Sequence, residues 1–116
     1  PHPFKSLHAT SNALDAFEFE RTGQEFLARF RAEYKAEPVW GAHYAYDATY
    51  VLVGAMQKAA SVEPEKLRAA LKVVDIRVPA TGSMRFSESG ERSYAPIAVY
   101  VTNSGKWDMV ARSDVW

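Results

Sequence analysis

The residue types that could do chemistry are present, but their spacing assembles no reaction centre. The three histidines, His2, His8 and His43, share no metal-ligand spacing with one another or with a carboxylate. The chain has no cysteine, which excludes thiolate metal sites and cysteine nucleophiles. No serine stands in a G-x-S-x-G motif, and no glycine cluster has the spacing of a phosphate-binding loop. The sequence therefore predicts a protein that is not an enzyme and that holds no metal or cofactor.

Carboxylates offer one unusual position, Asp47. Glu88 and Glu91 flank a turn and are expected to face solvent rather than to form an acid/base pair. Asp47 differs because it is the one acid inside an otherwise apolar segment. Buried carboxylates are rarely left unpaired, so we expect a partner on a neighbouring element or a backbone N–H. Direct contact with a ligand is the alternative.

The candidate ligand-binding residues are Trp40, Gly41 and His43, with Tyr44 behind them. They precede or open the same apolar segment. If that segment is a helix, they lie at its positive end, where backbone donors are free to meet a ligand. An aromatic wall and a hydrogen-bonding ring suit the holding of a small molecule. For Trp40, plain core packing is the alternative.

The element that must position these residues is a central helix, expected between Pro38 and Ala60. Its apolar residues recur at helical spacing, and its opposite side is hardly polar, so more than one side should be covered. It is too short and too interrupted by polar residues for a membrane span. The residues expected to be most buried are Tyr44, Ala48, Val51, Leu52, Ala55 and Met56.

Two further helices are expected on either side of the central one. Thr22 and Glu25 form a capping-box pattern in front of an amphipathic stretch. Pro64 suits the first turn of a third helix, in which four apolar residues form the buried stripe. That stripe consists of Leu67, Ala70, Leu71 and Val74. The helical part is expected to span residues 22–75, after a poorly patterned crossover or irregular segment over residues 1–21.

A small antiparallel sheet is expected over residues 80–112. After Pro79 the apolar period changes from 3.6 to 2, which predicts strands. Gly90 lies in a turn, and residues 103–106 read as a hairpin connection between the last two strands. The fold class predicted is therefore α/β, with three helices followed by a small three-stranded antiparallel sheet.

The composition limits the class of protein. With 116 residues the chain is expected to form a single domain, residues 1–116. Lysine plus arginine and aspartate plus glutamate number 14 each, so there is no basic excess to indicate nucleic-acid binding. No secretory signal or transmembrane run is present, so an export signal is expected to have been removed or to lie outside this chain.

Five motifs in order resemble one protein family. The motifs are F-x-x-E-Y-K-A-E-P over residues 30–38, A-H-Y-A-Y-D-A over 42–48, E-P-E-K-L-R-A-A-L over 63–71, T-G-S-M-R-F-S-E-S-G-E-R over 81–92, and G-K-W over 105–107. Over residues 20–110 the chain resembles the C-terminal part of the type I periplasmic solute-binding proteins of ABC importers, the branch of the leucine/isoleucine/valine-binding proteins.

The resemblance implies a fragment of a two-lobed receptor. The whole protein would bind a branched-chain amino acid or related small molecule between its lobes and hand it to an ABC permease from the periplasm. In this family the lobes are joined by crossing strands, and the stretch before the central helix contributes to the pocket. Here that stretch is Trp40 to His43, with Gly41 near where the family often has an aromatic residue.

Two other functions remain open from the sequence. The chain could be a structural or interaction module, or a ligand-sensing regulatory domain of the same fold, because a fold does not fix a function. In isolation it is expected to self-associate as a homodimer, since three helices can cover only one side of a sheet that is apolar on both faces.

Overall fold

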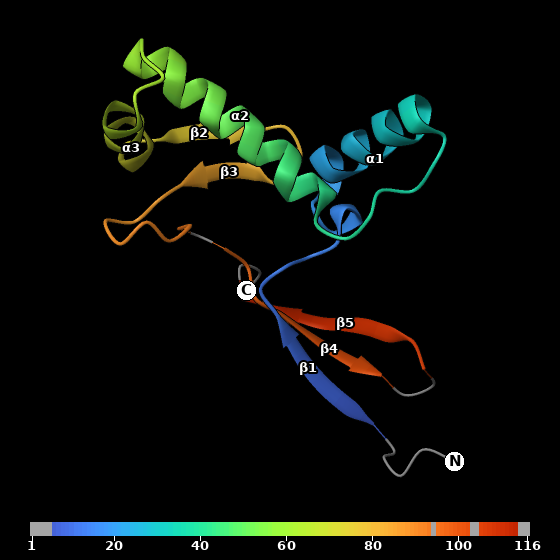
Figure 1. Ribbon diagram of the computed structural model, residues 1–116. Helices are drawn as coiled ribbons and strands as arrows, with labels where there is room; N and C mark the ends of the chain where they lie inside the picture. The colour runs from blue at the N-terminus through green and yellow to red at the C-terminus, as the bar shows by residue number, and fades with distance from the viewer. Residues whose placement is uncertain (1–5, 94, 103–104, 114–116) are drawn as a thin grey trace. The chain divides into compact units, whose positions relative to one another are not determined.

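The computed structural model describes residues 6–93, 95–102 and 105–113, and the chain divides into two compact units (Figure 1). One unit combines residues 1–14 with 94–116, and the other comprises residues 15–93. The chain therefore passes from one unit to the other after Leu14 and returns after Ser93. The expectation of a single domain over residues 1–116 stays a prediction. β1, near the start of the chain, pairs with β4, near its end, whereas β2 and β3 pair with each other in a separate sheet.

The unit formed by the two ends of the chain is a three-stranded antiparallel sheet in the order β1-β4-β5. β1 is Leu7–Ser11, β4 is Ala98–Thr102 and β5 is Trp107–Arg112. β1 pairs with β4 from Leu7 opposite Thr102 to Ser11 opposite Ala98. The last two strands lie where they were expected, but their burial does not alternate from residue to residue. Residues 103 and 104 of their expected connection lie outside the described residues.

β1 lies within residues 1–21, the segment that was expected to be a crossover or irregular. Its sequence, L-H-A-T-S, has no apolar alternation, and its first four residues are exposed. Pairing with β4 therefore holds this strand in place, and no hydrophobic pattern in the sequence predicts it. The sequence did not show this strand.

The second unit contains a β-hairpin that the sequence revealed only in half. β2, Asp75–Val78, pairs antiparallel with β3, Gly82–Arg85. β3 was expected, but β2 falls where the predicted helical part ended at residue 75. The third helix in fact ends at Lys72, and four residues are too few for an alternating pattern to stand out beside a helix.

Three α-helices accompany this hairpin (Figure 1). α1 is Glu20–Tyr34, preceded by a short 3-10 helix at Ala16–Glu18; α2 is Ala42–Ala59 and α3 is Pro64–Lys72. In Figure 1, α2 runs along the hairpin, with α3 beside its C-terminal end and α1 beside its N-terminal end. Pro64 occupies the first turn of α3, which confirms the predicted start of that helix.

Two hydrophobic clusters hold this unit together. The first joins α2, α3 and the hairpin, and its buried members are Val51, Ala55, Ala70, Val74, Val78 and Met84. Leu67 and Leu71 pack against it, so the predicted stripe of α3 is confirmed. The second joins the 3-10 helix, α1 and the turn after β2, with Ala16, Phe26, Leu27 and Ala80 as its buried members.

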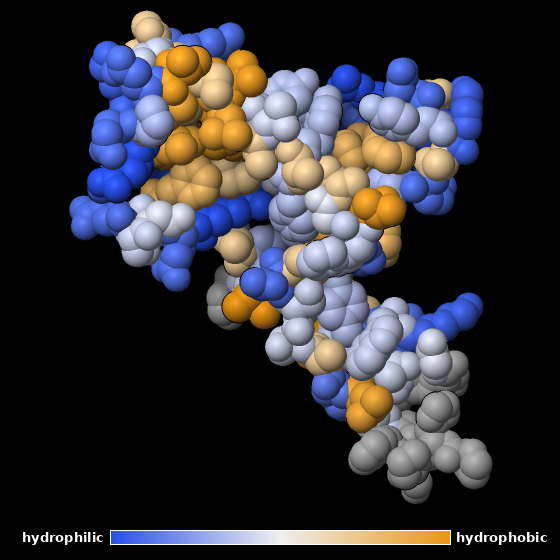
Figure 2. Space-filling view, viewed as in Figure 1, coloured by the Kyte–Doolittle hydropathy of each residue, from blue (hydrophilic) through white to orange (hydrophobic). Residues whose placement is uncertain are grey.

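The predicted core of α2 is right for two residues and wrong for two others. Val51 and Ala55 are buried, Tyr44 and Met56 are half-buried, but Ala48 is exposed and Leu52 is 44% exposed. The buried positions 43, 47, 51 and 55 form one line along the helix, and the neighbouring elements cover that line most completely. Leu52 follows Val51 and so points about 100° away from it. Figure 2 shows hydrophobic atoms gathered over the C-terminal part of α2.

The N-terminal turn of α1 differs from the expected capping box. The helix begins at Glu20, two residues before Thr22, so the Thr22 side chain does not cap it. The Thr22 hydroxyl instead donates toward the carbonyl oxygens of Phe19, at 3.0 Å, and Ala80, at 2.9 Å. Gly23 permits the close approach of α1 to the 3-10 helix, because a Cβ there would lie 1.7 Å from the Ala16 oxygen. No helix in the described part of the chain is long and apolar enough to cross a membrane.

The burial of α2 predicts unequal costs for two adjacent truncations. Val51→Ala should lower the free energy of unfolding by about 2 kcal/mol, because a buried side chain loses its packing. Leu52→Ala should lower it by less than about 1 kcal/mol, because the leucine is partly exposed. Urea denaturation of the two variants makes the comparison. An equal or larger loss at Leu52 would mean that the outer face of α2 is covered in solution.

Candidate functional site

The predicted ligand-binding residues lie on a tight turn that leads into α2. The Ala42 amide donates to the Val39 carbonyl at 3.1 Å, which closes a four-residue turn. Gly41 has φ 83° and ψ −5°, the values of the third residue of a type II turn. No atom lies within 4 Å of the position of a Cβ on Gly41, so the backbone conformation and not lack of space favours glycine. We call residues 39–42 the entry turn.

Trp40 projects from the entry turn and is 74% exposed. The alternative of plain core packing therefore does not hold for this side chain in the described chain. Val39 beside it is 78% exposed. Two adjacent apolar side chains on a turn place a hydrophobic surface immediately before the first residue of α2.

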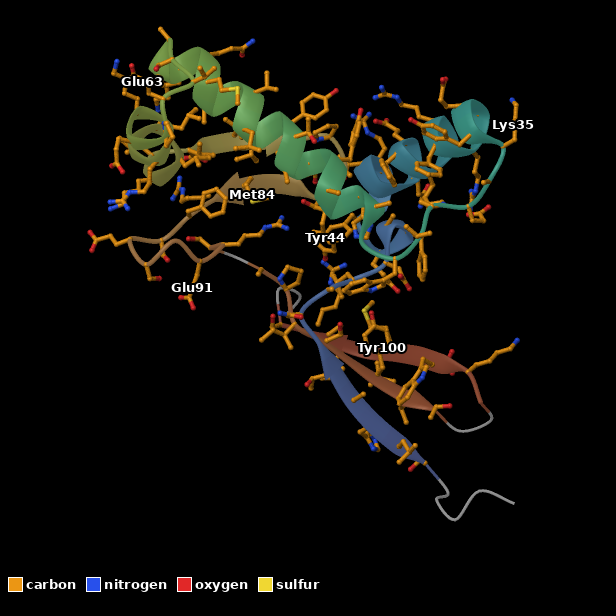
Figure 3. The ribbon with its side chains drawn as sticks, viewed as in Figure 1. Lys35, Tyr44, Glu63, Met84, Glu91 and Tyr100 are labelled. Carbon is orange, nitrogen blue, oxygen red and sulfur yellow. The ribbon has the colours of Figure 1, made fainter. Side chains whose placement is uncertain are left out.

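His43 points the other way, into the protein. It is 3% exposed and packs among aromatic rings, with centroid distances of 5.7 Å to Phe19, 6.2 Å to Phe26 and 4.2 Å to Tyr44. Tyr44 is half-buried and meets the Phe19 ring edge-on. Figure 3 shows Tyr44 at the N-terminal end of α2. Of the four predicted residues, the structure exposes Trp40, half-exposes Gly41 and Tyr44, and buries His43.

The first backbone amides of α2 are largely engaged, contrary to the expectation of free donors. The Ala42 amide bonds Val39, and the amides of Tyr44 and Ala45 both donate to the Gly41 carbonyl, at 3.0 and 3.1 Å. The type II turn uses the donor that an open helix start would offer. A ligand at this end of α2 would therefore meet the indole of Trp40 rather than a row of free amides.

The segment between α1 and the entry turn is held by an ion pair. The Arg31 guanidinium donates to both carboxylate oxygens of Glu37, from Nε at 2.7 Å and from Nη2 at 2.9 Å. These hydrogen bonds hold the pKa of Glu37 below its usual value and raise the pKa of Arg31. Both side chains are exposed, so the pair orients the segment and adds little to stability. The C-terminal end of α1, where Lys35 adopts φ 53°, is labelled in Figure 3.

Asp47, the unusual carboxylate, is fully buried and accepts two backbone hydrogen bonds. Its Oδ1 lies 2.9 Å from the Ala80 amide nitrogen and its Oδ2 lies 2.7 Å from that of Thr81. Both amides belong to the turn between β2 and β3, residues 79–81, which we call the hairpin turn. The expectation of a backbone N–H partner is thereby confirmed, and the two amides occupy both carboxylate oxygens.

The hairpin turn is tied down from three directions. α2 supplies the Asp47 carboxylate, and α1 supplies the Thr22 hydroxyl, which donates to the Ala80 carbonyl. Arg92 donates from Nη2 to the Thr81 hydroxyl at 3.0 Å and to the Ser83 carbonyl at 3.1 Å. The sequence did not reveal this convergence, because these residues are 9 to 58 positions apart.

A groove of about 850 Å³ lies between α1 and α2. Its aromatic lining includes Phe26, Phe30 and Tyr46, and the Arg29 guanidinium lies 5.9 Å from the Tyr46 ring centroid. The Tyr46 and Tyr50 hydroxyls are 3.2 Å apart. This hydrogen bond, followed by burial, raises the pKa of Tyr46. Within the described residues no group of three histidines, aspartates or glutamates could hold a metal ion.

Comparison with known proteins gives the fold a context. No protein-family model matches the chain, and no curated protein matches its sequence. Among the solved structures that match it, two each cover 93% of its length. The leucine-binding protein LivK from Thermotoga maritima superposes with a TM-score of 0.68 at 23% identity, and a periplasmic binding protein from Burkholderia mallei with a TM-score of 0.70 at 18% identity.

The likeness covers both units but only part of each solved protein. The chain spans 31% of the Thermotoga protein and 30% of the Burkholderia protein. It therefore has the fold of part of a type I periplasmic binding protein, with mixed helices and small antiparallel sheets. Both of these neighbours are binding proteins by name.

The opposite placements of His43 and Trp40 predict unequal effects of their truncation on stability. His43→Ala should lower the free energy of unfolding by about 2 kcal/mol, because it empties a space inside an aromatic cluster. Trp40→Ala should change it by about 0.5 kcal/mol or less, because the indole is exposed. Denaturant titration followed by far-UV circular dichroism measures both. Equal losses would show that the Trp40 ring packs in solution.

Proposed function

We propose that the chain is the C-terminal part of a two-lobed solute-binding protein that holds a small molecule between its lobes. The observation that carries this proposal is the match to two binding proteins over 93% of the chain, which includes both units. The chain connects those units twice, after residue 14 and after residue 93, and paired connections of this kind suit lobes that move relative to one another. The proposed role is binding without catalysis and without a cofactor.

The proposed ligand is a branched-chain amino acid or a related small molecule. The Thermotoga neighbour is a leucine-binding protein, and the exposed apolar surface of Trp40 suits an aliphatic side chain. We assign the ligand-facing surface to Trp40 and Gly41 of the entry turn. Tyr44 stands behind them, and His43 supports the turn from inside the aromatic cluster. The groups that bind the charged ends of an amino acid would come from the rest of the protein.

The proposed biological context is import through an ABC transporter. A binding protein of this fold would work in the periplasm and deliver its ligand to a membrane permease. The name of the Burkholderia neighbour, a periplasmic binding protein, supports this location.

The test of the proposed site is a change in affinity without a change in stability. In the complete protein, Trp40→Ala should weaken leucine binding about tenfold or more, because an aromatic contact with the ligand is lost. The melting temperature should stay nearly constant, since the indole is exposed. Isothermal titration calorimetry and a thermal melt measure the two quantities. Leu52→Ala, on α2 but away from the entry turn, is the matched control and should retain wild-type affinity. Equal affinity of wild type and Trp40→Ala contradicts the assignment.

We further propose that this chain alone self-associates as a homodimer. Large apolar side chains are exposed on both units, and soluble monomers rarely expose contiguous apolar patches beyond a few hundred Å². They include Leu52 and Val53 on α2 and Trp107 and Val110 on β5. β1 and β5 are also the outer strands of their sheet, and open edges favour pairing with another copy.

Sedimentation velocity at micromolar concentration tests self-association. The wild-type chain should sediment as a dimer, and Leu52→Glu, which places a charge on the exposed face of α2, should shift it toward the monomer. Glu65→Gln on the solvent-exposed face of α3 is the control and should leave the dimer intact. A wild-type chain that is wholly monomeric contradicts this proposal.

A further inference from the structure

The buried carboxylate of Asp47 lies one helical turn beyond His43, on the same face of α2. Positions 43 and 47 are four residues apart, which places them one above the other along the helix. Asp47 is six residues from Gly41, about 9 Å along the axis at 1.5 Å per residue. Over this distance a helix behaves as a rigid rod, so a shift at Asp47 also shifts the start of the helix. Whatever fixes Asp47 therefore fixes the start of α2 and the entry turn.

Apolar packing alone does not fix the rotation and the axial position of the N-terminal half of α2. Ala42, His43 and Tyr46 pack there against the second cluster and the rings of Phe19 and Phe26, but hydrophobic contact is non-directional. The two bonds from Asp47 are directional. Each carboxylate oxygen has its own donor, at 2.9 and 2.7 Å, so a slide or a rotation of α2 would stretch at least one of them.

The partner of Asp47 is itself immobilised. Ala80 has no exposed surface and Thr81 is buried, and the Thr22 hydroxyl and the Arg92 guanidinium hold the same turn from other elements. Among the described residues Asp47 is the one fully buried carboxylate. A buried ionised group is costly unless it is paired, so a sequence that keeps one there gains something that apolar packing would not supply.

We propose that Asp47 is a positioning residue for ligand binding. By joining α2 to the hairpin turn, it sets the register of the helix and so the place of Trp40 on the entry turn. This inference rests on the proposed function. A positioning role differs from a purely stabilising one. Loss of the two Asp47 hydrogen bonds should displace the entry turn even where the unit remains folded.

The experiment compares two variants of the complete protein that lose similar stability. Asp47→Asn keeps the shape but presents one donor to a backbone donor, so one of the two hydrogen bonds is lost. Val74→Ala empties part of the cluster between α2, α3 and the hairpin strands, at a residue that belongs to neither the hairpin turn nor the entry turn. Melting temperature, and leucine affinity by calorimetry well below it, are measured for both variants and for the wild type.

The positioning role predicts a difference in affinity between these variants. Asp47→Asn should weaken leucine binding about tenfold, whereas Val74→Ala should stay within about twofold of the wild type. Amide hydrogen exchange should become faster at Ala80 and Thr81 in Asp47→Asn alone. Equal affinity of the two variants, with both melting temperatures lowered, would overturn the inference and leave Asp47 a purely structural residue.

Two further outcomes separate this inference from the proposed function. A wild-type protein without affinity for leucine overturns the proposed ligand before any variant is compared. If Asp47→Asn does not fold, Thr22→Val carries the test, because it loosens the Ala80 carbonyl from the side of α1 and leaves the carboxylate in place. Thr22→Val should weaken leucine binding about threefold, and unchanged affinity would overturn the inference.

Discussion

A carboxylate without contact to water lies inside the larger unit, and two backbone amides of the hairpin turn are its donors. The dependence runs both ways. The turn is buried, so its amides need acceptors, and Asp47 is buried, so its charge needs donors. Loss of the carboxylate would leave two donors unsatisfied, each at a cost of about 1–3 kcal/mol. The positions of α2, the hairpin and, through Thr22, α1 meet at this one turn.

The arrangement also explains why α2 can be apolar nearly all round and still have a defined orientation. Four residues of α2 form its buried line, positions 43, 47, 51 and 55. His43 packs among aromatic rings, Asp47 makes the two directional hydrogen bonds, and the last two residues pack in the aliphatic cluster. The remaining faces carry Leu52 and Val53 toward solvent in this chain. In the proposed complete protein the other two-thirds of the structure would be available to cover them.

The sequence predicted those elements in which the apolar pattern repeats over enough residues to be recognised. Three helices were expected and are present, as are the strands around Met84 and Val99. β1 and β2 were missed because one has no apolar alternation and the other has only four residues beside a helix. Leu52 was misplaced because a helix apolar on every side does not reveal which side its neighbours occupy.

The site was predictable in outline and not in its contacts. Asp47 was recognisable as a buried acid in need of a backbone partner, but its donors lie 33 and 34 residues away. Gly41 was noted as a departure from an aromatic position, and its positive φ supplies a conformational reason for glycine. The burial of His43 depends on Phe19 and Phe26, which belong to elements whose packing the sequence does not record.

A crystal structure of the complete protein with leucine bound tests the central claim most directly. The account predicts leucine in van der Waals contact with Trp40 on the entry turn, while both oxygens of Asp47 still accept the Ala80 and Thr81 amides. Leucine seated without contact to any residue from 40 to 44 would contradict it.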